Sequence, residues 1–240
     1  STSGFTVTCY EGLIYFGAGW TSNIGKYDPQ TDKFSTVGGK LHDDTSYACA
    51  VTIKDDYLYA GISGDKNADG IDTAEIIKID LKTEEVVARV DIAEQFGPDE
   101  VMVRGIGIGG DTLFAGGNSM KGFVAVDINT MTLKDSGIHR AISLGTTEVI
   151  DGKLYLVVSG MGIYSYEIAT DTLTQIKDME LATIGFRCGV HSSVTLSNNP
   201  QFPGTSFVTM NSTGIKLYNF GLFLSGRFLA EESCRVDSPG

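Results

Sequence analysis

The sequence predicts an all-β fold built from five copies of one four-stranded unit. Three observations support this prediction. A two-part phrase recurs along the chain, short stretches alternate aromatic and β-branched residues, and 30 of the 240 residues are glycine. Alternating stretches of this composition are typical of strands, and abundant glycine fits many turns and close backbone contacts. Only the stretch "IAEQF" (92–96) hints at a helical turn.

The first part of the phrase is an aromatic-rich strand. Its copies are "GLIYFGAG" (12–19), "DYLYAGIS" (56–63), "DTLFAGGN" (111–118), "GKLYLVVSG" (152–160) and "TSFVTMNSTG" (205–214). Anchored on Tyr15, Tyr59, Phe114, Tyr155 and Val208, the copies are 44, 55, 41 and 53 residues apart. The average step is about 48 residues, which is typical of repeats that each form one small sheet.

The second part pairs another strand with a tight turn. It reads "KYDPQTDK" (26–33), "KIDLKTEE" (78–85) and "AVDINTMT" (125–132), each with an Asp-x-x-Thr step. Aspartate and threonine side chains bond nearby backbone groups, which favours a turn here. The fourth copy has Glu167 in place of aspartate, and the fifth has Asn219 with no threonine three residues later.

Two further strands complete each copy. Glycine-rich or small-residue segments precede the aromatic strand at 47–53, 103–109 and 144–150, as a crowded inner strand requires. Segments such as 85–92 and 226–236 follow the turn as outer strands. Each copy therefore has four strands, ordered from inner to outer.

The phrases "LYAG…IIKIDLKTEEVV" and "LFAGG…FVAVDINTMTL" resemble the β-propeller repeat families, most nearly the quinoprotein-like and YVTN-type blades. The resemblance implies one β-propeller domain over residues 1–240, with five blades of four antiparallel strands. The expected blades are approximately 1–40, 41–95, 96–138, 139–182 and 183–240. We expect these five blades to close into a ring, and the alternative is that they form part of a larger ring. The matching motifs are structural and contain no catalytic residue.

Composition excludes several classes of function. The net charge of −12 and the pI of about 4.6 oppose nucleic-acid binding. No apolar run is long enough for a transmembrane segment, and the first residues do not read as a signal peptide. The four cysteines form no C-x-x-C pair. A Cys9–Cys49 disulfide would staple the first two repeats and a Cys188–Cys234 disulfide would staple the last repeat, with buried thiols as the alternative.

The resemblance places the loops that lead into the inner strands at one face, around a central channel. These loops carry all three histidines together with several acidic and basic residues. The candidate ligand-binding residues are Trp20, His42, Asp44, Asp99, Arg104, His139, Arg140, Arg187 and His191. Trp20 lies on a glycine-rich loop and is a candidate platform for stacking a sugar.

The segment "GDKNADGIDTAE" (64–75) resembles the front of a calcium loop. Oxygen ligands at alternate positions let a short loop wrap a hard cation. The expected ligands are Asp65, Asn67 and Asp69, with Asp72 or Glu75 closing the shell. The alternative is an ordinary surface loop, which these residue types also favour.

We expect an extracellular, non-catalytic recognition propeller that binds a glycan or protein on the channel face, with Ca²⁺ supporting the fold. One alternative is a five-bladed glycoside hydrolase or lyase that uses channel carboxylates. Its catalytic candidates are Asp44, Asp99, Glu148 and His191. A second alternative is a scaffold within a larger assembly. No G-x-S-x-G or H-E-x-x-H motif is present, so the enzyme class is less favoured.

Overall fold

The structure, a computed structural model, describes most of the strands and their short turns. The described residues are 4–18, 23–39, 41, 47–63, 74–92, 103, 105–116, 124–134, 144–146, 149, 151–158, 162–177, 192–197, 204–211, 214–222 and 228–236. The chain divides into two compact units, Ser1–Ser143 and Leu144–Gly240. The units are described separately.

The first unit contains three four-stranded sheets. The first sheet consists of β1 (Gly4–Tyr10), β2 (Leu13–Ala18), β3 (Ile24–Asp28) and β4 (Lys33–Val37). The second sheet consists of β5 (Tyr47–Lys54), β6 (Tyr57–Ser63), β7 (Ala74–Asp80) and β8 (Glu85–Asp91). The third sheet consists of β9 (Gly105–Gly109), β10 (Thr112–Gly116), β11 (Val124–Asp127) and β12 (Thr132–Lys134).

The second unit contains two sheets of the same kind. The fourth sheet consists of β13 (Leu144–Thr146), β14 (Lys153–Val158), β15 (Gly162–Glu167) and β16 (Thr172–Lys177), with the 3-10 turn η1 (Ile168–Thr170) between the last two. The fifth sheet consists of β17 (Ser192–Ser197), β18 (Gly204–Asn211), β19 (Gly214–Leu222) and β20 (Phe228–Val236).

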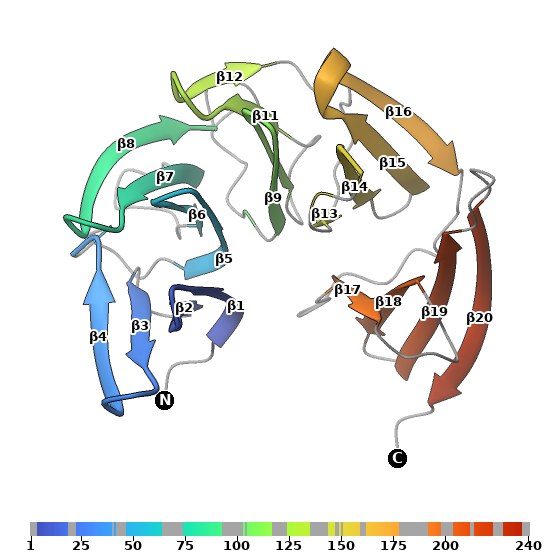
Figure 1. Cartoon of the computed structure of the whole chain (residues 1–240), viewed down its shortest axis with the longest axis horizontal. Coiled ribbons are helices and arrows are strands. Elements are labelled where there is room, and N and C mark those ends of the chain that lie inside the picture. Colours follow the sequence, from blue (N-terminus) through green and yellow to red (C-terminus); the bar gives the residue numbers. More distant parts are fainter. Residues whose placement is uncertain are drawn as a thin grey trace, which may run out of the picture. The chain divides into compact units, whose positions relative to one another are not determined.

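Every sheet is an antiparallel meander in which the strands follow chain order. Figure 1 shows β1, β5 and β9 along the same side of the first unit, with β4, β8 and β12 on the opposite side. The predicted all-β fold and the order of strands within each repeat are therefore confirmed. The helical hint at 92–96 lies outside the described residues except for Ile92. No helix in the described part of the chain is long and apolar enough to cross a membrane.

The core of the first unit lies between facing sheets. Strand residues alternate between the two faces of a sheet, so the second strand of each sheet points one row of side chains at the next sheet. Tyr15 of β2 enters the cluster shared by the first and second sheets, and Tyr59 of β6 enters the cluster shared by the second and third. Both rings are almost completely buried. The aromatic anchors of the repeat are thus residues of the packing between sheets.

Two residues after each anchor of the first unit stands a glycine, and in the first two sheets it allows the next repeat to approach closely. A Cβ atom on Gly17 would lie 2.0 Å from the carbonyl oxygen of Ala48, which begins the buried part of β5. A Cβ atom on Gly61 would lie 2.2 Å from Cγ1 of Val103. The third sheet has Gly116 at the same position. The recurring glycine therefore sets the distance between sheets in this unit.

The other face of the first sheet is apolar and is not covered by described residues of the first unit. Register places Cys9, Ile14, Tyr27 and Phe34 in one row across the sheet, because each pair lies directly opposite. Phe34 is 70% exposed. The matching positions Leu58 and Ile79 of the second sheet are fully buried against the first sheet.

We expect Gly17→Ala to destabilise the first unit by about 1–3 kcal/mol, because the added methyl meets backbone that has no room to move. Urea unfolding followed by circular dichroism measures this change. Ser35→Ala, on exposed β4, is the control and should change the free energy of unfolding by less than about 0.5 kcal/mol. Equal midpoints for the two variants would contradict the assigned role of Gly17.

Candidate functional site

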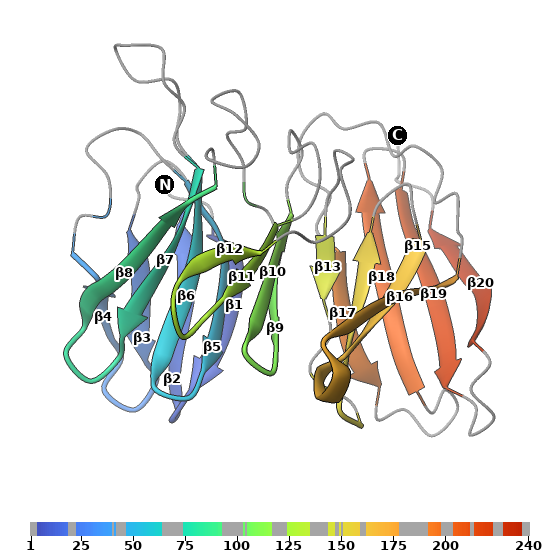
Figure 2. The same ribbon diagram turned by 90° about the horizontal axis from the view of Figure 1, so that it is seen from above.

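The meander topology separates two ends of every sheet. The connections β1–β2 and β3–β4 lie at one end, which we call the turn end, as do their counterparts in the other sheets. Figure 2 shows the short turns of the first unit together at its lower end. The connections β2–β3 and those between successive sheets join the strands at the opposite end, which we call the loop end. In the first unit the turn end is wholly described, whereas most of the loop end is not.

Aspartates cap the hairpin turns that the sequence predicts. Asp28 accepts hydrogen bonds from the Gln30 N–H at 2.8 Å and the Thr31 hydroxyl at 2.7 Å. Several hydrogen bonds hold the pKa of Asp28 below its usual value, and the bond from the Thr31 hydroxyl has the largest effect. Asp127 accepts the N–H groups of Asn129 and Thr130 at 2.9 and 3.0 Å. The Thr130 N–H is the main cause of a lowered pKa at Asp127.

The fourth residue after each capping position adopts the left-handed conformation. The residues are Asp32, Glu84, Met131 and Asp171, with φ of 53°, 59°, 53° and 51°. In the second sheet, the N–H of Glu84 also donates to the carbonyl of Asp80 at 2.7 Å. The turn of the fourth sheet, η1, also ends in a left-handed residue, although Glu167 stands at the capping position in place of aspartate. Glu167 instead forms an ion pair with Lys153 at 3.1 Å.

A backbone latch joins the two turns of a sheet. The residue after the capping position donates its N–H to the neighbouring hairpin turn: Leu81 to Asp56 at 2.9 Å, Ile128 to Asp111 at 3.0 Å and Ile168 to Gly152 at 3.1 Å. The first sheet has Pro29 at this position. Proline has no N–H, so the first sheet lacks this latch.

Polar side chains also brace one sheet against the next at the turn end. The Tyr10 hydroxyl of β1 donates to Asp56 of the second sheet at 2.5 Å, and Lys82 pairs with the same carboxylate. The Lys82 bond and then the Tyr10 bond lower the pKa of Asp56, and the Asp56 bond raises the pKa of Tyr10 to about 12. One sheet further on, the matching residue Lys54 binds the Gly110 carbonyl and lies 3.4 Å from Asp111.

A second brace begins two residues before the capping aspartate. Lys26 pairs with Glu84 of the second sheet, and Lys78 donates to the Ile128 carbonyl of the third sheet at 2.9 Å. The Lys78 ammonium also lies 4.3 Å from the centre of the Tyr57 ring. Sequence reasoning missed this role, although the lysines are visible in the recurring "KYD" and "KID". The third sheet has Ala125 at this position and Gly109 at the position of Tyr10, so it carries neither bracing side chain.

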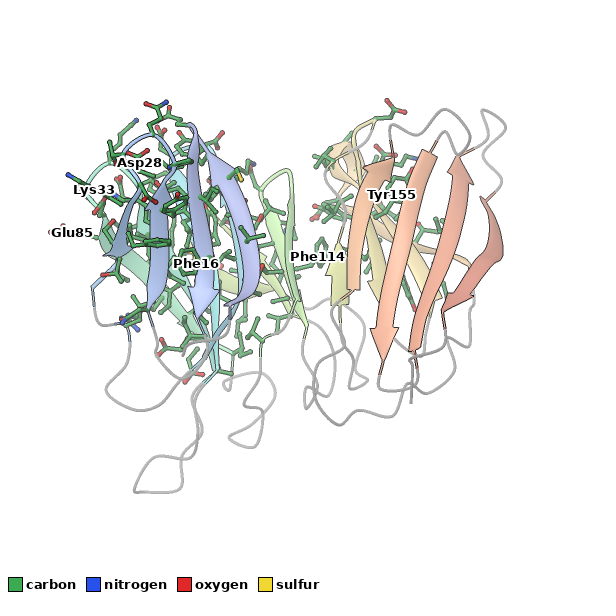
Figure 3. All side chains as sticks on the ribbon, turned by 90° about the horizontal axis from the view of Figure 1, so that it is seen from below. Phe16, Asp28, Lys33, Glu85, Phe114 and Tyr155 are labelled. Carbon is green, nitrogen blue, oxygen red and sulfur yellow. The ribbon has the colours of Figure 1, made fainter. Side chains whose placement is uncertain are left out.

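These contacts give the turn end a structural role. The carboxylates of Asp28 and Asp127 bond turn backbone, and Asp56, Lys26, Lys54 and Lys78 bond groups of a neighbouring sheet. Figure 3 shows Asp28 at this end of the first sheet, with Phe16 nearer the middle. The candidate site for a ligand is therefore the loop end.

The predicted loop-end residues lie outside the described part of the chain. These residues are Trp20, His42, Asp44, Asp99, Arg104, His139, Arg140, Arg187 and His191; the catalytic candidate Glu148, between β13 and β14, lies outside it too. Their arrangement as a channel rim stays a prediction. The described strands do support its premise, because β5, β9 and β13 each begin after one of the predicted loops.

Four of the five predicted calcium ligands, Asp65, Asn67, Asp69 and Asp72, also lie outside the described residues. The fifth, Glu75, is part of β7 and pairs with Arg89 of β8 at 2.9 Å. Arg89 also donates to the Leu41 carbonyl at 3.1 Å. Within the described ranges, no group of three or more His, Cys, Asp or Glu side chains could hold a metal ion.

Cys9 is a free, exposed thiol, so the suggested Cys9–Cys49 disulfide is not formed in this structure. The register explains the difference. Cys9 lies opposite Ile14, on the uncovered face of the first sheet, and therefore points away from the second sheet and β5. The side chains of Cys49, Cys188 and Cys234 lie outside what the structure describes.

Comparison with known proteins relates the chain to others through its fold. No family model matches the sequence, and no curated protein matches it. Solved structures do match. The major allergen Mala s 1 of Malassezia sympodialis has a TM-score of 0.67 and 11% identity, with coverage of 98% of this chain and 79% of the allergen.

Two further matches are the Cps50 (Swd1) β-propeller domain of Myceliophteria thermophila and a chain of a mitotic checkpoint complex. The first has a TM-score of 0.61 and 11% identity, covering 99% of this chain and 72% of its own. The second has a TM-score of 0.60 and 13% identity, covering 96% and 64%. Such low identities establish the fold alone. Together with the meander sheets, these structural matches show that this chain has a β-propeller fold.

We expect Asp28→Asn and Asp127→Asn to lower the thermal midpoint at neutral pH. The hydrogen bonds to each aspartate lower its pKa in the folded protein, so they stabilise the fold at pH values above the pKa of the unfolded chain, ~3.9. This contribution is lost as the pH falls through the folded-state pKa. The difference from wild type should therefore shrink as the pH falls below ~4. Thermal scans from pH 7 to pH 3 measure it. Glu85→Gln, on exposed β8, is the control; a constant difference across the range would contradict the capping role.

Proposed function

We propose that the chain is a non-catalytic binding propeller that takes a glycan or protein ligand at its loop end. The observation that carries this proposal is the contrast between the two ends. At the turn end of the first unit, the connections are short, and the carboxylates of Asp28, Asp56 and Asp127 bond the fold itself. At the loop end, the connections include the long segments 64–73 and 93–102. Long loops on a rigid scaffold are where binding residues concentrate.

The residue types of the loop-end segments support a polar ligand. Asp44, Asp99 and Arg140 occur at similar distances before the aromatic anchors of their repeats. A ring of mixed carboxylates and guanidinium groups suits the hydroxyls of a sugar or the polar groups of a protein surface. Trp20 would add an aromatic face for stacking.

Comparison at the level of fold also favours recognition over catalysis. A structural neighbour of this chain was solved as part of a mitotic checkpoint complex. In that protein, a fold of this kind takes part in a protein assembly. The present sequence also lacks the nucleophile and metalloprotease motifs sought above.

We further propose an extracellular location, with calcium bound by Asp65, Asn67 and Asp69. The acidic composition and the spacing of these oxygen ligands support the calcium site. Glu75 already pairs with Arg89, so the closing ligand we favour is Asp72.

The binding proposal is tested with Asp44→Ala, Asp99→Ala and Arg140→Ala variants on an immobilised panel of glycans and secreted proteins. We expect wild type to retain at least one of them and each variant to bind about tenfold more weakly, with an unchanged thermal midpoint. Glu85→Ala is the control. A wild-type protein that retains nothing, or variants that bind normally, would contradict the proposal. Cleavage of a retained glycan would instead favour the enzyme alternative.

Calcium should raise the thermal midpoint if the 64–75 segment binds it, because a ligand of the folded state stabilises by mass action. We expect a chelator to lower the midpoint reversibly by several degrees, on the order of 1–3 kcal/mol at saturating calcium. Asp65→Ala with Asp69→Ala should abolish the response, and Asp111→Ala should preserve it. The absence of any shift at millimolar calcium would remove the calcium site.

A further inference from the structure

The outer strand β4 offers a regular, open sheet edge. In the described part of the chain it pairs only with β3, through five consecutive residue pairs from Asp28↔Lys33 to Ile24↔Val37 without a register shift. An edge strand presents backbone N–H and C=O groups along its free side, which is a template for another extended chain.

The other outer strands are protected in ways that β4 is not. β8, β16 and β20 each pair with a register shift, which interrupts the regular edge. β12 is only three residues long. Bulges and short strands are common means of preventing edge-to-edge pairing. Among the five described outer strands, β4 alone is both regular and longer than three residues.

Side chains favour strand addition at the same place. Four of the five residues of β4 are exposed. Phe34, 70% exposed, ends an apolar row across the sheet. Its ring stacks on Tyr27 at 4.4 Å and meets the edge of Phe16 at 6.4 Å. A strand added outside β4 would place a side chain directly beside Phe34 and continue this row.

We propose that the edge of β4 binds an extended peptide segment of a partner protein by strand addition. This surface is separate from the loop end and goes beyond the function proposed there. Backbone hydrogen bonds would supply affinity, and alternate side chains would supply specificity. The edge has only a backbone template and an aromatic row to offer, so an extended peptide matches it better than a folded surface does.

The chemistry of β4 also defines the partner segment. Phe34 and Thr36 lie on one face of the strand, and Lys33 and Ser35 lie on the other. The partner should therefore carry an aromatic or β-branched residue beside Phe34, flanked by polar residues beside Lys33 and Ser35. No carboxylate lies within β4 itself, although the whole chain carries a net charge of −12. A neutral or acidic peptide strand can thus lie along it without a directly opposed negative charge.

The test uses the full chain and a synthetic peptide, Thr-Val-Thr-Phe-Thr-Val-Thr, as the probe. Hydrogen–deuterium exchange of residues 33–37 should slow at least about fivefold with the peptide near 1 mM. Exchange of β8, residues 85–91, should not change. A peptide N-methylated at two adjacent central residues keeps its side chains but loses a donor on each edge, so it should give no protection.

Two variants of Phe34 and one control complete the design. Phe34→Glu and Phe34→Lys should each weaken the affinity for the peptide at least about tenfold, and so reduce the exchange protection of residues 33–37. Their thermal midpoints should stay close to that of wild type. Val87→Glu, at another exposed apolar residue of an outer strand, should bind as wild type does. Unchanged exchange in wild type, normal binding by both Phe34 variants, or equal protection by the N-methylated peptide would overturn the proposal.

Two other outcomes identify a different occupant. Protection of 33–37 without peptide that rises with protein concentration, together with a dimer on size exclusion, would show that a second copy occupies the edge and would overturn the proposed partner. Asp44→Ala should leave the peptide effect unchanged. Loss of the effect in that variant would mean that the peptide binds the loop end, again overturning the proposal.

Discussion

In the described part of the chain, the fold depends on sheets that pack face to face without a covering α-helix. In the first unit, Tyr15 and Tyr59 fill the space between successive sheets. Gly17 lets Ala48 of β5 come close to its backbone, and Gly61 does the same for Val103, which precedes β9. The aromatic and the glycine work as a pair: a large ring fills the interface at one position, and a missing side chain admits a neighbour two residues later. This pair is the "LYAG" signature of the repeat.

Polar bonds at the turn end add specificity to this apolar packing. The capping aspartates fix hairpin shape within one sheet, whereas Tyr10, Lys26, Lys54 and Lys78 reach the next sheet. Exposed ion pairs contribute little individually. Their value here is geometric, because each brace comes from the same position of its repeat and meets the same region of the following sheet. This use of polar groups leaves the turn end with few side chains for a ligand.

Local and periodic features could be predicted from the sequence, and features of the fold in three dimensions could not. The capped turns at Asp28 and Asp127 follow from residue chemistry that acts over a few positions. The predicted Cys9–Cys49 pairing was wrong, because the adjacency of two repeats does not determine which face of its strand a residue occupies. Strand side chains alternate between faces, and this alternation places Cys9 on the face away from the second sheet.

The lysine braces were visible as repeated letters, but their partners lie about fifty residues away and depend on sheet packing. Glu75 pairs with Arg89 from its position in β7, and the calcium site of residues 64–75 remains a prediction. The grouping of Asp44, Asp99 and Arg140 remains a prediction.

The bracing pattern also explains which parts of the chain act together. Both braces run from the first sheet to the second and from the second to the third. The third sheet carries Gly109 and Ala125 at the bracing positions, and neither side chain can extend the series. The boundary between the two compact units follows this sheet, at Ser143 and Leu144. Within the first unit, apolar packing and polar braces therefore join the same pairs of sheets. We infer that these three sheets unfold cooperatively, because opening either interface breaks both kinds of contact at once.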